Sequence, residues 1–311
     1  MSIPASRRLV RTVLGDIEPG ELGPCDAHEH LFLDTPLQPG EEFLDEERAI
    51  AEARALYELG GRSLVDWTPL GLGRKLEGLV AVATATGLKI VAATGLHRDA
   101  HYTEDDPVRS LPAHRLAQTF AEEILSAEIP CGVIKAGASY HRVTAFEYTV
   151  FEAAAEAHAR TGAPVCVHAE HGTNGLGLVE LLASLGVRSS SVILAHLDRN
   201  PDAGEHAETA ATGAWLQFDG PGRTKYWPDS TIMRLIADLS ERGLDRQMLL
   251  GGDTGRRSMM RAYGGGPGLD YLFRRFKPRL ERELGGALSA RIFVDNPARA
   301  FSFEARTHST P

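Results

Sequence analysis

The 311-residue sequence has few cysteines, and their spacing does not suggest disulfide bonds or a zinc ribbon. Cys25, Cys131 and Cys166 stand far apart, and none forms part of a Cys-x-x-Cys pair. Small secreted domains carry many paired cysteines, whereas isolated cysteines are typical of proteins in a reducing compartment. We therefore expect three free thiols and a cytoplasmic protein.

Long hydrophobic runs and an excess of positive charge are also lacking. No segment approaches the roughly 20 apolar residues that cross a membrane, and no apolar run of signal-peptide type follows the arginines near the N-terminus. The formal net charge is -9 at pH 7, whereas nucleic acids and anionic membranes are bound by clustered Lys and Arg. These absences argue against nucleic-acid and membrane partners and leave a small-molecule substrate.

Apolar, β-branched segments and segments with helical spacing alternate along the whole chain. The predicted strands are residues 25–30, 63–68, 89–95, 132–137, 164–170, 192–198, 215–220 and 248–254. The predicted helices between them are residues 46–59, 76–86, 111–127, 145–160, 176–185 and 231–242. Such alternation predicts a parallel sheet covered by helices.

Eight such units without a linker favour closure of the sheet into an α/β (β/α)8 TIM barrel over an open doubly wound sheet. No Gly-x-Gly-x-x-Gly motif opens the first unit, as it would in a dinucleotide-binding fold. We expect residues 1–311 to form a single barrel domain, because barrels of this type routinely reach this length. The glycine-rich segment 257–279 is the longest departure from the repeat, and we expect it to be a loop over the barrel mouth.

Two histidines, His28 and His30, lie two positions apart in the first predicted strand. Side chains at this spacing point to the same face of a strand, so one metal ion could take both imidazoles. A packed or solvated pair is the alternative, and this motif alone does not decide between them.

Further metal-binding side chains lie at or near the ends of later predicted strands, namely His168, His196 and Asp253. In a TIM barrel the C-terminal ends of the strands meet at one mouth, which holds the active site. Burying several imidazoles and a carboxylate there without a metal ion or other partners would be costly. Lys135 on the fourth predicted strand would be an unpaired buried charge, unless it is solvated, ion-paired or chemically modified.

The ordered set resembles the amidohydrolase superfamily and, more narrowly, its phosphotriesterase-like group, over nearly the whole chain. The matching positions are His28 and His30 on the first predicted strand, Lys135 on the fourth, His168 on the fifth, His196 on the sixth and Asp253 on the eighth. The resemblance implies a metal-dependent hydrolase, and a homodimer would also agree with it.

The resemblance further implies two divalent metal ions, one held by His28, His30 and Asp253 and the other by His168 and His196. Carboxylation by CO2 would turn Lys135 into a ligand that bridges both ions. A hydroxide between the ions would attack the substrate while Asp253 acts as the general base. Such mixed ligands suit Zn²⁺, which we expect, and also Mn²⁺, Co²⁺ or Fe²⁺.

Within this family, residues 217–229 and 253–272 resemble members that hydrolyse sugar lactones, some of them phosphorylated. Lys225 and Arg256 match the anion-binding positions of those members, although solvated loop charges are the alternative interpretation. Met259 stands where phosphate-binding members have tyrosine, which leaves a phosphate group open. We expect a lactonase for a small polar or anionic sugar lactone.

Two other functions stay open at the sequence level. Phosphotriesterase, amidase and esterase activities would use the same metal chemistry, because specificity is set by loops. However, Gly220 follows Asp219 where organophosphate hydrolases and acyl-homoserine lactonases carry a His or Arg, which makes those two activities less favoured. A non-catalytic ligand-binding barrel is the alternative from another class.

Overall fold

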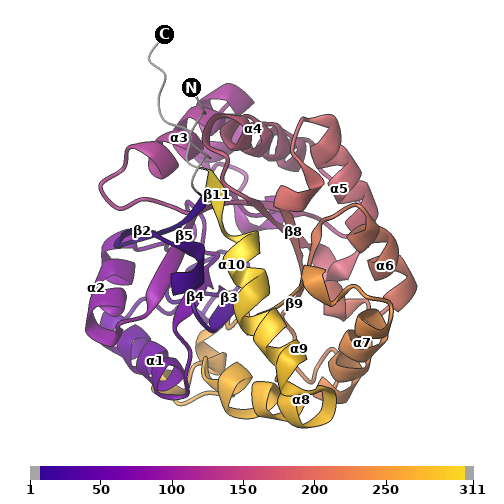
Figure 1. Cartoon of the computed structure of the whole chain (residues 1–311). Coiled ribbons are helices and arrows are strands. Elements are labelled where there is room, and N and C mark those ends of the chain that lie inside the picture. The colour runs from indigo at the N-terminus through magenta and orange to yellow at the C-terminus, as the bar shows by residue number, and fades with distance from the viewer. Residues whose placement is uncertain (1–7, 305–311) are drawn as a thin grey trace, which may run out of the picture.

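The computed structural model describes residues 8–304, and its central feature is a barrel of eight parallel strands (Figure 1). The strands are β3 (Cys25–Glu29), β4 (Ser63–Asp66), β5 (Lys89–Gly95), β6 (Val133–Ala138), β7 (Val165–Ala169), β8 (Val192–Ala195), β9 (Trp215–Phe218) and β10 (Met248–Leu250). They pair in sequential order from β3 to β10. The amide of Asp253 donates a 2.8 Å hydrogen bond to the carbonyl of His28, which brings the ends of β10 and β3 together. The predicted barrel and its eight strands are confirmed.

Helices surround the barrel as the alternation predicts (Figure 1). They are α1 (Glu46–Glu58), α2 (Leu76–Thr86), α3 (Ala113–Leu125), α4 (Ala145–Thr161), α5 (Gly175–Ser184), α6 (Ala203–Ala211), α7 (Asp229–Glu241), α8 (Lys277–Leu284), α9 (Gly286–Ala290) and α10 (Asn296–Ala300). All six predicted helices are present. No helix was predicted for α9 and α10, nor for α6, whose alanine-rich segment has few large apolar side chains to give a helical period.

Local capping interactions fix where several helices begin and end. The side chain of Thr144 accepts from the amide of Glu147 at the start of α4, and the carboxylate of Glu147 accepts from the amide of Thr144 in return. Gly162 ends the same helix at φ 82°, a left-handed conformation that glycine adopts without steric cost. The loop between β6 and α4, which borders the barrel mouth, is therefore held at its helical end.

The prediction for residues 257–279 is correct for its first part and wrong for the rest. The segment crosses the mouth as a loop with short helical turns up to Tyr271, and then becomes the π-helical turn η10 (Leu272–Phe276), which leads into α8. Leu272, Phe276 and Leu280 recur every four residues and are all buried. This apolar face packs into the core, so the chain forms a helix where glycine content suggested a loop.

A small antiparallel sheet covers the end of the barrel opposite the mouth, and the sequence analysis did not predict it. It is formed by β1 (Arg8–Thr12), β2 (Gly15–Ile17) and β11 (Phe303–Glu304). Val10 and Phe301 pack against the apolar lower half of the barrel interior. The barrel is thus filled with hydrophobic side chains at one end, and its polar side chains gather at the other.

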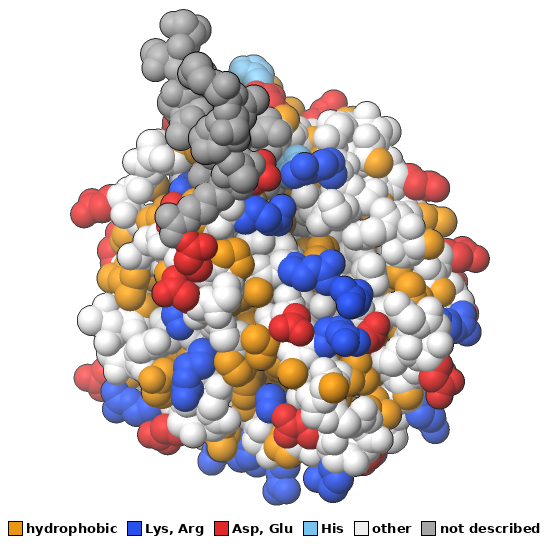
Figure 2. Space-filling model, in the orientation of Figure 1, with side chains coloured by type: hydrophobic (Ala, Val, Ile, Leu, Met, Phe, Trp, Pro, Cys, Tyr) orange, Lys and Arg blue, Asp and Glu red, His pale blue; other side chains and the backbone are white. Residues whose placement is uncertain are grey.

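On the face that Figure 2 shows, acidic and basic side chains are interspersed, with hydrophobic ones scattered between them. No helix within residues 8–304 is long and apolar enough to cross a membrane. Cys25, Cys131 and Cys166 are buried free thiols, as predicted.

Candidate metal centre

All the side chains predicted to bind metal lie together at the mouth of the barrel. They are His28, His30, Lys135, His168, His196 and Asp253, and none is more than 7% exposed. Each lies on a barrel strand or within three residues of its C-terminal end. Parallel strands bring these ends to one face, which explains why residues so distant in the sequence meet.

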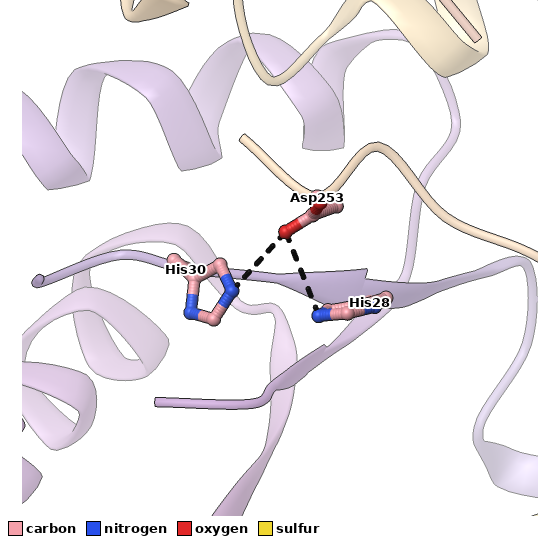
Figure 3. Close-up of side chains that lie close together, drawn as sticks. All are labelled: His28, His30 and Asp253. Carbon is pink, nitrogen blue, oxygen red and sulfur yellow. Dashed lines mark ion pairs between the residues drawn. The ribbon is translucent and has the colours of Figure 1, made fainter. Parts of the chain in front are cut away.

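One group of donor atoms comes from β3 and from the segment after β10 (Figure 3). His30 Nε2 lies 3.3 Å from Asp253 Oδ1, and His28 Nε2 lies 3.7 Å from the same oxygen. Within the described chain, His28 Nε2 is buried without a hydrogen-bond partner. A buried polar atom left without a partner is costly, and a divalent cation among these three donors would satisfy it. The residues therefore fit a metal ion.

A second pair of donors lies beside this group. His168 Nδ1 and His196 Nε2 are 2.7 Å apart, and both rings are buried. Burial lowers the pKa of both imidazoles. The nearby His196 ring lowers the pKa of His168 further, and Arg199 lowers that of His196 further. Both rings are therefore held neutral, the form in which imidazole binds metal.

In His30 and His168, the ring nitrogen that faces away from the other donor atoms contacts a neighbouring oxygen. His30 Nδ1 is 2.8 Å from Thr68 Oγ1, and His168 Nε2 is 2.6 Å from Glu170 Oε2. Such partners set the tautomer and orientation of a metal-binding histidine. Glu170 thus supports His168, and Glu29 accepts from the amide and hydroxyl of Thr254 beside Asp253.

Asp219, just after β9, supports one histidine of each donor group. Its Oδ2 lies 3.1 Å from His28 Nδ1 and its Oδ1 lies 2.6 Å from His196 Nδ1. Burial alone would raise the pKa of Asp219, but His196 and His28 hold that pKa well below its usual range. Since both oxygens already accept from imidazoles, Asp219 orients the ligands and does not form a third metal site. The sequence analysis missed this role, although its place after a barrel strand was a usable signal.

Replacing Asp219 with Asn is expected to weaken metal binding at both donor groups by about 10–100-fold, the usual cost of losing an outer partner of a metal ligand. An amide oxygen can accept one of the two bonds, but its NH2 group cannot accept the other. Metal affinity measured by competition with a chromogenic chelator checks this. Asp238→Asn, at an exposed position of α7, is the matched control, and equal affinities for both variants would contradict the role.

Lys135 is a buried amine with no polar partner. Its Nζ lies 4.4 Å from the centre of the Trp67 ring, which also stacks on His28 with 4.0 Å between ring centres. Within residues 8–304, Lys135 makes no side-chain hydrogen bond or ion pair, and it is 1% exposed. Burial lowers its pKa to about 8. Lys135 thus has no ion-pair partner within these residues, and a substantial fraction of its amine is neutral near pH 8.

Two arginines that the sequence analysis did not assign hold the outer oxygen of Asp253. Arg199 Nη2 and Arg223 Nη1 lie 2.9 and 2.8 Å from Asp253 Oδ2. Burial would raise the pKa of Asp253, but Arg223 and His28 keep it well below its usual range. Asp253 is thus an ionised carboxylate with one oxygen toward the histidines and one toward the arginines.

The predicted substrate-binding residues lie on the rim of the same cavity. Lys225 and Arg256 line the roughly 170 Å³ space over the metal-binding side chains. Arg256 Nη1 lies 3.9 Å from Glu41 Oε1. A neighbouring hollow of about 410 Å³ is lined by Lys225, Arg256, Arg223 and Met259. The structure brings these cations together beside the centre and leaves their contacts with substrate as a proposal.

Comparison with known proteins agrees with this geometry. The model of the phosphotriesterase family matches residues 8–301. A phospho-furanose lactonase of Mycoplasmopsis synoviae is 30% identical, over 98% of this chain and 94% of its own length, and the phosphotriesterase homology protein of Escherichia coli is 33% identical, over 88% and 96%. The crystal structure of a lactonase from Listeria monocytogenes superimposes with a TM-score of 0.89 at 30% identity, covering 95% of this chain and 99% of that one.

The predicted class, a metal-dependent hydrolase, and its use of divalent metal are supported by these relatives together with the His and Asp donor group. The match of nearly the full described length leaves no part of the barrel outside the comparison. The chain therefore belongs to the phosphotriesterase family.

Proposed function

We propose that this protein is a lactonase with two metal ions that opens a small, anionic sugar lactone. The observation that carries the proposal is the cluster of cationic side chains, Lys225, Arg256 and Arg223, at the edge of the cavity over the metal-binding residues. Relatives named as lactonases support the reaction, and two of them are named as acting on phosphorylated furanoses.

The proposed cofactors are two Zn²⁺ ions and a carboxyl group on Lys135. His28, His30 and Asp253 would hold one ion, and His168 and His196 the other, with the carboxylated Lys135 between them. The neutral amine of Lys135 would attack CO2, forming an N–C bond and releasing one proton. When bound, the ions would lower the pKa of a water molecule held between them and polarise the lactone carbonyl.

The chain's own residues would position the lactone and move the proton. Asp253 would accept the proton that attack by water releases, because its carboxylate is ionised and faces the centre. Lys225 and Arg256 would bind a phosphate or carboxylate on the substrate by charge-assisted hydrogen bonds. The half-buried Met259 offers no hydroxyl to such an anion, so the two cations would carry its recognition.

Hydrolysis of a lactone panel tests this function. The metal-loaded protein should open sugar lactones that carry a phosphate or carboxylate faster than their neutral analogues, and a chelator should abolish the activity. Turnover of an amide, an ester or a phosphotriester with every lactone inert would favour the corresponding alternative. No hydrolysis of any compound by metal-loaded protein would favour the non-catalytic ligand-binding barrel.

The double variant Lys225→Met, Arg256→Met is expected to raise KM for an anionic lactone by at least about 100-fold, since hydrogen bonds to charged groups contribute about 1.5–3 kcal/mol each and two are lost. The KM for the neutral analogue should change far less. Steady-state kinetics on the matched pair of lactones provides the measurement. Arg234→Met, on the exposed side of α7, is the control, and equal KM changes for both lactones would exclude an anion site here.

A further inference from the structure

A large, open cavity lies next to the metal-binding side chains and has no part in the function proposed above. It encloses about 1140 Å³, whereas the space over the metal-binding residues is about 170 Å³. A cavity of this volume could hold a drug-sized ligand, since such ligands occupy pockets of about 300–1,000 Å³. A small single-ring lactone bound over the metal-binding residues would therefore leave the outer cavity empty. Three side chains, Arg98, Glu170 and Arg199, line both spaces.

This shared wall carries alternating hydrogen-bond donors and acceptors. Arg98 Nε lies 3.1 Å from Glu170 Oε2, the oxygen that also contacts His168. Arg199 spans the wall from Asp253 to the ring of Tyr226, which lies 4.7 Å from its guanidinium carbon. A ligand that reached from one space into the other would therefore pass between charged groups that are already fixed.

The loops that form the outer cavity are held in uncommon backbone conformations. His141 and His171 have φ values of 52° and 55°, in the left-handed region that side chains other than glycine rarely adopt. Thr173 ties the two loops together, because its hydroxyl accepts from the amide of His141 and donates to the carbonyl of Glu170. Such conformations cluster at binding and catalytic sites, where the surroundings hold them in place.

Exposed aromatic rings line one side of the cavity, and a further, half-buried ring lies beside them in the inner space. Tyr140 is 58% exposed, and its ring centre lies 5.8 Å from that of His171, which in turn lies 6.2 Å from Tyr226. Exposed aromatic rings beside a concave polar surface are suited to stacking against the apolar face of a ring. Tyr140 also meets the ring of His141 edge to face, with 4.5 Å between ring centres, and more than half of its surface stays open to a ligand.

The chemistry of the lining selects the kind of ring. Apart from threonine methyl groups, Ala100 supplies the only aliphatic side chain of the lining residues, and the rest offer guanidinium, carboxylate, hydroxyl, amide or imidazole groups. A hydrocarbon or aryl group would strip water from these polar groups without replacing their hydrogen bonds. Sugar hydroxyls both donate and accept, so they match the mixed lining.

We propose that the outer cavity binds a second sugar ring, so that the substrates include lactones bearing a glycosyl substituent. The second ring stacks on Tyr140, and its hydroxyls bond to the wall formed by Arg98 and Glu170. This inference rests on the proposed lactonase function and extends it to a larger substrate class.

Kinetics on single-ring and two-ring lactones tests the inference. We expect kcat/KM for at least one of lactobionolactone and maltobionolactone to exceed that for gluconolactone by about tenfold, the value of one good aromatic contact. Tyr140→Ala should remove this preference, and Tyr140→Phe should retain it. Tyr148→Ala, an exposed tyrosine on α4 outside the cavity, should leave the preference as in the wild type.

The outcomes separate this inference from the proposed function. If the protein opens gluconolactone and both two-ring lactones with equal kcat/KM, the second-ring site is overturned and the lactonase function stands. A preference for a two-ring lactone that Tyr140→Ala leaves intact also overturns it. If none of these lactones nor any anionic lactone is opened, the proposed function itself fails.

Discussion

Replacing Lys135 with Ala is expected to remove most bound metal and to lower kcat/KM by far more than about 100-fold, because even outer partners of metal ligands cost 10–100-fold. Lys135 lies on β6 with its amine over Trp67, which stacks on His28, and it is buried without a side-chain hydrogen bond or ion pair in the described chain. Elemental analysis of freshly purified protein, beside kinetics on an anionic lactone, provides the measurement. The wild type should carry about two metal ions per chain.

The matched control is Lys277→Ala, which removes a lysine paired with Glu281 on the partly exposed helix α8. Surface ion pairs contribute little, so this control should keep full metal content and activity. Thermal unfolding should show that both variants are folded at the assay temperature. A folded Lys135→Ala protein that retains two metal ions and wild-type activity would refute the bridging role of Lys135.

Sequence periodicity was sufficient to predict the barrel, since each strand shows its own apolar run and each is followed by a helical or loop segment. The metal-binding side chains could be predicted for a related reason: they lie on, or just after, five of the eight barrel strands, and parallel strands end at one face. His28 and His30 needed only the two-residue period of a strand. These parts depend on local pattern and on a general rule of the fold.

The exact ends of most barrel strands could not be predicted, and β8 and β10 show the largest differences. The sequence analysis placed strands at residues 192–198 and 248–254, but β8 and β10 end at Ala195 and Leu250. His196 and Asp253 have φ values of 68° and 46°, so the chain turns sharply at the ligands themselves. Left-handed residues other than glycine are held by tertiary contacts, which a local pattern does not report.

Contacts between distant segments were also beyond reach. Asp219 is 191 positions from His28, and nothing in either local sequence indicates that they meet. Arg199 and Arg223 are surrounded by loop residues, where a solvated charge is the ordinary expectation. Only the folded barrel shows that both guanidinium groups turn inward to Asp253.

Asp253→Asn is expected to lower kcat by about 100- to 10,000-fold, the range in which general acid–base groups contribute. The change preserves shape but removes the negative charge between His28, His30 and the two arginines. Arg199 and Arg223 are buried, with side chains only 7% and 9% exposed, and the variant would remove the carboxylate that they share. Leaving two buried guanidinium groups without this partner is itself destabilising. We therefore also expect a lower unfolding temperature.

Metal content separates the two roles of Asp253, as ligand and as proton acceptor. If Asp253→Asn retains both ions while kcat falls, the missing function is proton acceptance, because an amide oxygen can still coordinate but cannot take up the proton. If one ion is lost as well, the carboxylate is needed to hold it beside His28 and His30. Asp253→Glu restores the charge at a shifted position. It should recover more of the metal content than of kcat, since proton transfer depends more steeply on distance than ion binding does. A kcat within tenfold of wild type in the metal-loaded Asn variant would assign the proton to another group, and the arginine pair on Asp253 would then serve structure alone.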